Sequence, residues 1–192
     1  MSSISSLKNI HKLGLFGNYI DKNENKIIKI KEIKNINLFQ VVKYKNSIKN
    51  ISNLEIDGVK LSETLKTSNN LSTRIIWMGP NNWYIFSIKD ITKHLKIFNE
   101  TDFAVTDLSQ SRSIIELEGD MAYEVLKKGS PLDISKLKAG DCANTVYNGI
   151  TITLDFISKD PNIIRIFGLR SFGESLYHSI TDSSLEFGYK SV

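Results

Sequence analysis

The sequence predicts an α+β protein in which helices pack on an antiparallel or mixed sheet. Two pairs of β-favouring stretches flank turn residues, Gly79-Pro80-Asn81-Asn82 in one pair and Asn148-Gly149 in the other. Such pairs are typical of antiparallel hairpins. Helical patterns near residues 90–98, 120–129 and 171–180 are interposed among the paired strands. Strands in pairs with helices interposed predict the α+β class.

The segment from Asp107 to Asp133 has the clearest boundaries. Ser113 to Glu118 alternates as a half-buried strand, and Gly119 ends it. Asp120 then stands where a helix N-cap is expected, because its carboxylate could accept free backbone N–H groups of the first turn.

The helix predicted after Asp120 is short. Its buried face would consist of Ala122, Val125 and Leu126. Lys127 and Lys128 suit its negative end, and Gly129 could serve as a C′ residue with positive φ. Pro131 prevents continuation of the helix.

The first hairpin is predicted from Leu71–Met78 and Trp83–Ile88. Asp90 could cap a helix that runs through Phe98. Its buried side would be Ile91, Leu95 and Phe98. Phe103–Leu108 would then return as a strand.

The second hairpin joins Cys142–Tyr147 to Ile150–Phe156, because both residues of Asn-Gly accept the positive φ of a type I′ turn. Ile163–Phe167 is a further strand. Ser171 and Glu174 then form a capping-box pattern. The helix that follows would run to about Ile180 and bury Phe172, Leu176 and Ile180.

The N-terminal third is distinct in charge. Residues 1–66 carry 12 Lys and 6 acidic residues, whereas the rest of the chain is net acidic. We therefore divide the chain into a Lys-rich segment, residues 1–60, which a partner could order, and an α+β domain, residues 61–192. Met1–Leu13 could form a short helix or an arm, Asp21–Asn37 has no clean period, and Leu38–Tyr44 suggests a strand.

Composition indicates a globular protein of the cytoplasm. The chain has 192 residues, with 41% hydrophobic and 24% charged residues. No stretch approaches the roughly 18 apolar residues of a membrane span, and no targeting segment is evident. The single cysteine, Cys142, cannot form an intramolecular disulfide, which agrees with a reducing compartment.

Candidate catalytic and metal residues are few. His11, His94 and His178 lie in separate segments without the spacing of a zinc site. Cys142 is interpreted as a small buried residue. Glu116 and Glu118 share a strand face, where two exposed acids explain them more simply than paired catalytic carboxylates. No Gly-x-Gly-x-x-Gly or Walker pattern occurs. We expect no catalytic, cofactor-binding or metal-binding residue in this chain.

Four residues are candidate subunit contacts or structural ties. Arginine is the rarer cationic residue in this chain, and its planar guanidinium group has the donor geometry to bind buried or interfacial carboxylates. On that ground we select Arg112 and Arg170. Trp77 and Trp83 flank the first hairpin turn, where core packing competes with a role as interface anchors.

A series of short motifs is similar to the gamma subunits of heterotetrameric sarcosine oxidases. The motifs are Trp77-Met78-Gly79-Pro80-Asn81-Asn82-Trp83, Asp107-Leu108-Ser109 with Ser111-Arg112, Gly119, Val125-Leu126-Lys127-Lys128-Gly129, Pro131-Leu132-Asp133, Gly140-Asp141-Cys142-Ala143, Arg170-Ser171-Phe172 and Glu186-Phe187-Gly188. Together they cover roughly residues 60–190. The chain departs from the pattern at Gln110 and Ser130, where His and Cys are expected, and at Asn81-Asn82, which replaces an acidic turn.

The resemblance implies a fold related to the folate-binding domain of the aminomethyltransferase family. It also implies membership of a complex that oxidises sarcosine to glycine and passes the one-carbon unit to tetrahydrofolate. The partners would be the alpha, beta and delta subunits. FAD and FMN would lie with beta, NAD and the folate site with alpha, and zinc with delta. The gamma subunit would hold no cofactor and would support assembly.

Two other functions stay open at this point. A free-standing folate-binding one-carbon protein would share the fold, although no pterin-binding carboxylate can be matched residue by residue. An RNA-binding module would suit the basic first third. However, no RNP1-like run is present and the C-terminal part is net acidic. Neither nucleic acid nor a membrane is expected as a partner.

Overall fold

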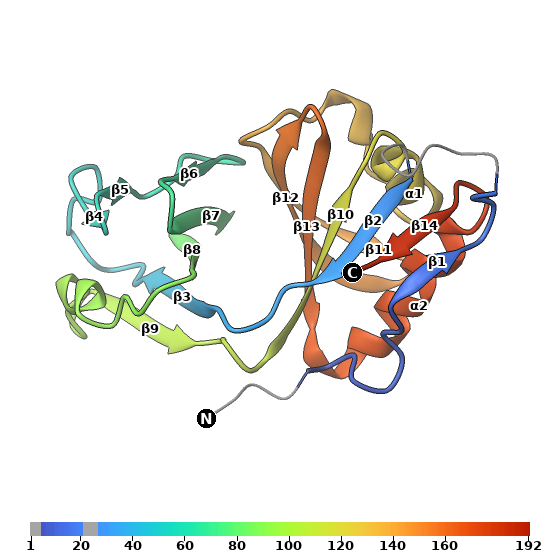
Figure 1. Cartoon of the computed structure of the whole chain (residues 1–192). Helices are drawn as coiled ribbons and strands as arrows, with labels where there is room; N and C mark the ends of the chain where they lie inside the picture. Colours follow the sequence, from blue (N-terminus) through green and yellow to red (C-terminus); the bar gives the residue numbers. More distant parts are fainter. Residues whose placement is uncertain (1–4, 21–26) are drawn as a thin grey trace. The chain divides into compact units, whose positions relative to one another are not determined.

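The computed structural model describes residues 5–20 and 27–192. The chain divides into two compact units (Figure 1). Unit 1 combines residues 1–34 with residues 111–192, and unit 2 is residues 35–110. Unit 2 is therefore inserted into the sequence of unit 1.

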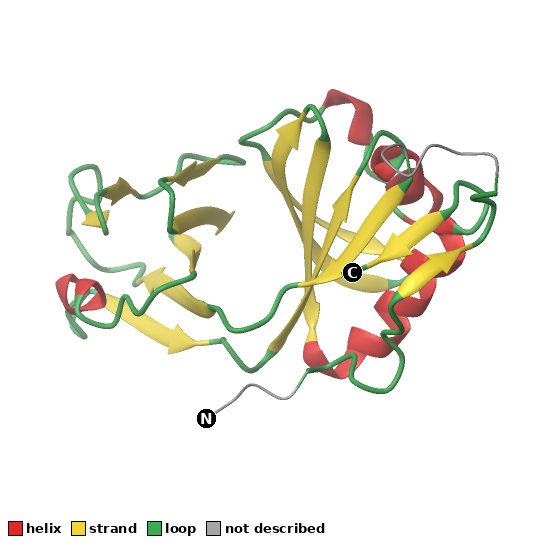
Figure 2. Ribbon diagram, viewed as in Figure 1, coloured by secondary structure: helices red, strands yellow, loops and turns green. Residues whose placement is uncertain are grey.

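Unit 1 is built on a seven-stranded mixed sheet with strand order β1-β14-β2-β10-β13-β12-β11. Its strands are β1 (Gly14–Phe16), β2 (Ile28–Glu32), β10 (Arg112–Glu118), β11 (Cys142–Tyr147), β12 (Ile150–Lys159), β13 (Asn162–Leu169) and β14 (Tyr189–Ser191). β14 and β2 pair in parallel, and the other neighbours pair antiparallel. Figure 2 shows the helices of this unit beside the sheet.

Two helices cover one face of this sheet. They are α1 (Ala122–Gly129) and α2 (Gly173–Ser184), accompanied by the short 3₁₀ helices η3 (Ile134–Lys136) and η4 (Arg170–Phe172). The predicted buried residues of α1 are all inaccessible, and so are Leu176 and Ile180 of α2. They share one core with alternate residues of the strands, including Ile115, Leu117, Leu154, Ile164 and Ile166. This core anchors unit 1.

The predicted ends of α1 are wrong in detail. Met121 is the N-cap residue and no side chain caps the helix, so Asp120 does not serve as the cap. Gly129 is the last helical residue and is not among the residues with positive φ. Glycine is required there for a different reason, because a Cβ would lie 2.6 Å from Cε2 of Tyr147.

The predicted capping box of α2 is also wrong. The helix begins at Gly173, directly after η4, and no side chain caps it. A Cβ on Gly173 would lie 3.1 Å from Ser113, so the helix start lies close to β10. Phe172 is 48% exposed and not buried as predicted.

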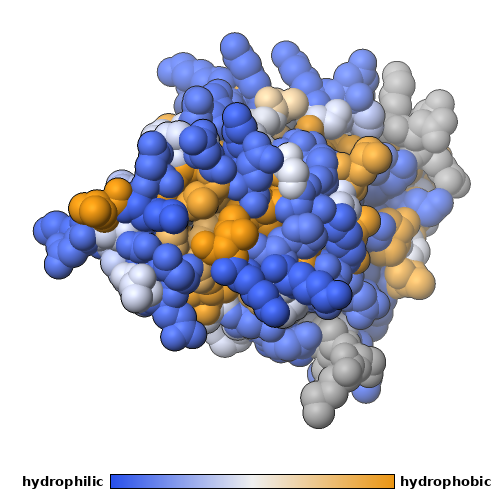
Figure 3. Space-filling model, turned by 90° about the vertical axis from the view of Figure 1, so that its left-hand side faces the viewer, coloured by the Kyte–Doolittle hydropathy of each residue, from blue (hydrophilic) through white to orange (hydrophobic). Residues whose placement is uncertain are grey.

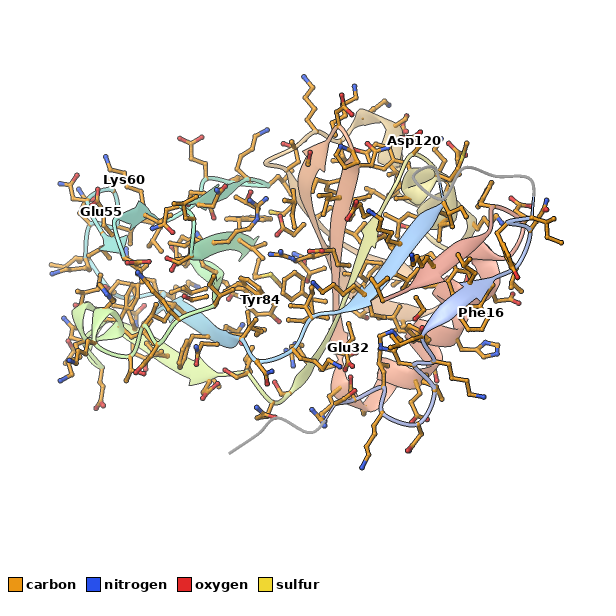
Figure 4. The ribbon with its side chains drawn as sticks, in the orientation of Figure 1. Phe16, Glu32, Glu55, Lys60, Tyr84 and Asp120 are labelled. Carbon is orange, nitrogen blue, oxygen red and sulfur yellow. The ribbon has the colours of Figure 1, made fainter. Side chains whose placement is uncertain are left out.

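Unit 2 contains a five-stranded antiparallel sheet with strand order β6-β7-β8-β3-β9. The strands are β3 (Asn37–Lys43), β6 (Thr67–Asn69), β7 (Thr73–Gly79), β8 (Asn82–Ser87) and β9 (Phe103–Asp107), and a separate hairpin is formed by β4 (Glu55–Ile56) and β5 (Val59–Lys60). Figure 4 labels Glu55 and Lys60, which face each other across that hairpin. Asn81 has the positive φ that the predicted β7–β8 turn requires.

The helix predicted after Asp90 is reduced to the 3₁₀ helix η2 (His94–Ile97). Asp90 uses its Oδ1 to accept the backbone N–H of Thr92 at 2.9 Å and caps no helix. Ile91, Leu95 and Phe98 are nevertheless buried, as the apolar spacing predicted. Apolar periodicity therefore identified the buried side chains but overestimated the helix length.

The predicted α+β class with a mixed sheet is confirmed. All strands predicted from residue 38 onward are present within two residues of their expected bounds, except that β12 extends three residues beyond Phe156. Of the N-terminal segment, Leu7 is fully buried, whereas Ile4 lies outside the described residues. Residues 1–60 contain β1 to β5, and their status as a separate, partner-ordered segment stays a prediction.

Candidate functional site

Arg112 and Arg170, two predicted contact residues, meet at the carbonyl oxygen of Ser111. Nη1 of Arg112 donates to this oxygen at 3.2 Å, and the backbone N–H of Arg170 donates to it at 3.0 Å. Both arginines are half-buried. They come together because β10 and β13 pair antiparallel, which places Arg112 opposite Leu169. Arg112 makes this contact with its side chain and Arg170 makes it with its backbone N–H, and the role of both as subunit contacts or structural ties stays a prediction.

The two tryptophans differ in their surroundings. Trp83 is 3% exposed, and its Nε1 donates to the carbonyl oxygen of Ser62 at 2.9 Å. Trp77 lies opposite it across β7 and β8 and is half-buried against the core of unit 2. Trp83 is therefore a core residue, and Trp77 keeps some surface that a partner could contact.

Unit 2 also exposes several large apolar side chains. Figure 3, a view turned by 90° about the vertical axis from that of Figure 1, shows hydrophobic residues at the surface between hydrophilic ones. The exposed large apolar residues of unit 2 are Tyr44, Ile48, Leu65, Leu71, Ile88, Ile97 and Val105. Exposed apolar residues that are scattered singly over a protein surface are normal. Only a contiguous patch of them indicates an interface.

A row of polar side chains crosses the sheet of unit 1. Strand register places in line, from β11 to β2, Cys142, Asp155, Arg165, Glu116 and Lys31. Opposite residues project to the same face, and alternate residues of these strands belong to the core under the helices. The row therefore lies on the face away from α1 and α2.

The centre of this row is an ion pair. Nε of Arg165 donates to Oε2 of Glu116 at 2.7 Å, and the two side chains are 21% and 15% exposed. Asp155, opposite Arg165 in register, is completely buried. Carboxylates buried to this extent are normally paired with cations or donors. The sequence prediction that Glu116 is a solvated acid is wrong, and Glu118 pairs with Lys29 at 2.7 Å.

A second buried carboxylate holds the N-terminal arm of unit 1. Glu32, labelled in Figure 4, is 5% exposed and accepts hydrogen bonds from the hydroxyls of Ser5 and Ser6. Ser6 also bonds Ser113 of β10 at 2.9 Å. These hydrogen bonds attach the polar N-terminal arm to β2 and β10, next to Leu7, which is buried in the core of unit 1.

His11 lies in the same arm. Its ring packs against Tyr177 of α2 with centroids 5.3 Å apart. Burial lowers the pKa of His11, and the nearby Glu32 carboxylate opposes this effect. Its Nε2 is buried and finds no hydrogen-bond partner within residues 5–20 and 27–192. His178 lies in α2 of unit 1, and His94 lies in η2 of unit 2.

Asp57 links the β4–β5 hairpin to more distant segments of unit 2 through its carboxylate, and the sequence analysis did not identify it. Its carboxylate accepts hydrogen bonds from Lys89 Nζ at 2.7 Å, Thr73 Oγ1 at 2.8 Å and Ser72 Oγ at 3.0 Å. The Lys89 and Thr73 hydrogen bonds hold the pKa of Asp57 well below its usual range. Positive φ at Asp57 and Gly58 forms the β4–β5 turn. Asp-Gly between apolar residues is a hairpin signal that could have identified this position.

Possible metal ligands do not cluster in the described part of the chain. Within it, no group of three His, Cys, Asp or Glu residues is arranged to hold a metal ion. Cys142 is 1% exposed, as expected of a small buried residue. In the same residues no helix is both long enough and apolar enough to cross a membrane.

Comparison with known proteins identifies a shared fold. No sequence family and no curated protein matches this chain. Among solved structures, it is similar to a chain of the heterotetrameric sarcosine oxidase from Corynebacterium sp. U-96 in complex with pyrrole 2-carboxylate. The TM-score is 0.75 at 22% identity, and the match covers 86% of this chain and 87% of that one.

A second structural relative is the aminomethyltransferase T of the glycine cleavage system from Bartonella henselae. The TM-score is 0.62 at 14% identity, covering 88% of this chain and 48% of that chain. This protein therefore spans about half the length of that enzyme. At such identities the likeness establishes the fold, and it bears out the predicted relation to both groups at that level.

Proposed function

We propose that this chain is the non-catalytic gamma subunit of a heterotetrameric complex that oxidatively demethylates sarcosine to glycine. The complex would pass the one-carbon unit to tetrahydrofolate. One observation carries the proposal: the match to a sarcosine oxidase chain extends over nearly the full length of both chains. The aminomethyltransferase, by contrast, is covered over only about half its length. A subunit-for-subunit correspondence accounts for this difference.

The residues support a structural role for the chain. Its sequence contains no Gly-x-Gly-x-x-Gly or Walker pattern that would cradle a dinucleotide phosphate. The resemblance to sarcosine oxidase gamma subunits implies that the chemistry of FAD, FMN, NAD, tetrahydrofolate and zinc belongs to the alpha, beta and delta partners. The ion pair of Arg165 and Glu116 and the Asp57 hydrogen bonds all serve the chain's own fold. In the assembled enzyme this chain would position the other subunits.

The proposed subunit contacts are Trp77 and the junction of Arg112 with Arg170. Trp77 keeps exposed ring surface, and the Arg112–Arg170 junction is half-buried at the unit 1 surface. Tryptophan and arginine are the residue types that most often dominate binding energy at interfaces. Trp83, already within the core of unit 2, is assigned to stability instead.

Co-expression tests the proposal. The tagged chain is produced with the candidate alpha, beta and delta chains from the same source, and a parallel preparation omits this chain. We expect a yellow, stoichiometric complex that oxidises sarcosine only when all four chains are present. A complex that assembles and turns over sarcosine at the same rate without this chain would contradict the subunit role.

A second candidate is a free-standing folate-binding one-carbon protein. It is favoured by the fold shared with the aminomethyltransferase over 88% of this chain. Calorimetric titration of the isolated chain with tetrahydrofolate separates the two candidates. Saturable binding by the chain alone supports this alternative, whereas no heat of binding supports the subunit proposal.

A further inference from the structure

A cavity in unit 1, which we call the arm–helix pocket, lies between the N-terminal arm and α2. Its volume is about 580 Å³, and the residues used below are Lys12, Phe16, Glu174, Tyr177, His178 and Tyr189. Small-molecule sites in proteins usually measure about 300–1,000 Å³. All lining residues belong to unit 1, so the pocket is complete within one compact body.

One wall of the arm–helix pocket is formed by α2. Glu174, Tyr177 and His178 are spaced i, i+3 and i+4, which places them on one side of the helix. Leu176 and Ile180 occupy a different stripe, which packs into the core of unit 1. Tyr177 therefore belongs both to the core of unit 1 and to the pocket wall, whereas Glu174 and His178 are exposed.

The opposite wall is aromatic. Phe16 of β1 and Tyr189 of β14 are partners in strand register, and their rings stack with centroids 5.2 Å apart at an interplanar angle of 22°. Figure 4 labels Phe16 on its strand beside α2. The Tyr177 hydroxyl already bonds Ser191 at 3.0 Å. These rings therefore offer mainly apolar surface to a bound molecule.

Two charges of opposite sign complete the arm–helix pocket. Lys12 comes from the arm and Glu174 from the first turn of α2. Neither side chain forms an ion pair or hydrogen bond with any other residue of the described ranges. Glu174 would repel an anionic ligand and Lys12 would repel a cationic ligand. A zwitterion can instead pair its ammonium with Glu174 and its carboxylate with Lys12.

We propose that the arm–helix pocket binds a free α-amino acid with an apolar side chain. The ligand carboxylate pairs with Lys12, its ammonium pairs with Glu174, and its side chain lies on the Phe16–Tyr189 stack. Such a ligand bridges the N-terminal arm to α2. The proposal is independent of the subunit assignment, because every residue it uses lies in unit 1 of this chain.

Isothermal titration of the full-length chain tests the ligand class. L-phenylalanine is compared with 3-phenylpropionate, which lacks the ammonium, with 2-phenylethylamine, which lacks the carboxylate, and with glycine, which lacks the ring. We expect L-phenylalanine to bind roughly three- to tenfold more tightly than each of the other three. Equal affinity for all four, or no binding of any at millimolar concentration, would overturn the proposal.

Two variants assign the charges. Lys12→Met should abolish the preference for L-phenylalanine over 2-phenylethylamine, and Glu174→Gln should abolish its preference over 3-phenylpropionate. Lys8→Met in the same arm and Asp182→Asn in the same helix are matched controls, because both residues are exposed and lie outside the pocket. Far-UV circular dichroism verifies folding. If folded Lys12→Met and Glu174→Gln variants keep the wild-type preferences, the proposed orientation is wrong.

Discussion

Arg165 of β13 and Glu116 of β10 form an ion pair, with Nε donating to Oε2 at 2.7 Å, although 49 positions separate them in sequence. The contact exists because antiparallel register places these residues directly opposite each other. Asp155 lies opposite Arg165 in register, on the same face of the sheet, away from the helices. The ion pair joins β10 to β13 by side chains as well as by backbone hydrogen bonds.

Glu116→Gln should therefore destabilise unit 1. Removing one partner of a poorly exposed pair leaves the other charge undercompensated, and we expect a loss of about 1–3 kcal/mol in the free energy of unfolding. The matched control is Glu124→Gln, which removes the exposed pair with Lys127 and should change stability by less than about 0.5 kcal/mol. Amide NMR signals of β10 in a urea series report on unit 1 directly. Equal effects of the two substitutions would refute a special role for the Arg165–Glu116 pair.

Gly129→Ala should disturb the packing of α1. The new Cβ would lie 2.6 Å from the ring of Tyr147, which is fully buried and whose hydroxyl donates to the carbonyl oxygen of Val125 at 3.0 Å. Overpacking of this kind costs about 1–3 kcal/mol. Gly79→Ala is the control, because nothing lies within 4 Å of its added Cβ and its φ is not positive. Thermal unfolding of both variants, followed by circular dichroism, checks the contrast.

Asp57 should make the stability of unit 2 sensitive to acid. Folding holds the pKa of this carboxyl below its value of about 3.9 in unfolded chains. The stabilisation is therefore fully present above that value and is lost as pH falls below it. Because Trp77 and Trp83 both lie in unit 2, tryptophan fluorescence in urea reports on this unit.

We expect the urea midpoint of wild type to fall between about pH 5 and pH 2, and to fall less steeply in Asp57→Asn. Glu63→Gln provides the control in the same unit, because Glu63 is exposed. Parallel pH profiles for wild type and Asp57→Asn would show that another group controls the acid response.

The two tryptophans should separate stability from assembly. Trp83→Phe removes the hydrogen bond to Ser62 and should lower the stability of unit 2 by about 1–2 kcal/mol. Trp77→Phe removes a half-buried ring edge and should have the smaller effect on stability. In the co-expressed complex, Trp77→Ala should reduce the recovery of partner chains. Unchanged recovery would remove Trp77 from the proposed interface.

The sequence was informative where a local pattern decides the structure. Alternation predicts β10, and Asn148-Gly149, with φ of 45° and 81°, predicts the turn between β11 and β12. Helix ends were less predictable. At α1 the backbone N–H of Ala122 bonds the carbonyl oxygen of Gly119, so the helix starts beyond Asp120 and leaves that carboxylate without a capping role.

Long-range features could not be predicted from local patterns. Gly129, at the end of α1, must be glycine because the ring of Tyr147, at the end of β11, approaches it closely. The Arg165–Glu116 contact and the Glu32 anchor depend on strand register and on an N-terminal arm that returns to β2 and β10. Asp57 was missed although its Asp-Gly turn was visible, because its partners Ser72 and Lys89 lie far along the chain. These positions are determined by tertiary packing.

The central claim, that this chain functions as a subunit, is tested most directly by the mass of the species it forms. The tagged 21.8 kDa chain is co-expressed with the candidate alpha, beta and delta chains, and the purified product is measured by native mass spectrometry. We expect one dominant species containing one copy of each chain together with its flavins. Recovery of the chain as an isolated 21.8 kDa monomer, with the flavoprotein chains assembled separately, would contradict the claim.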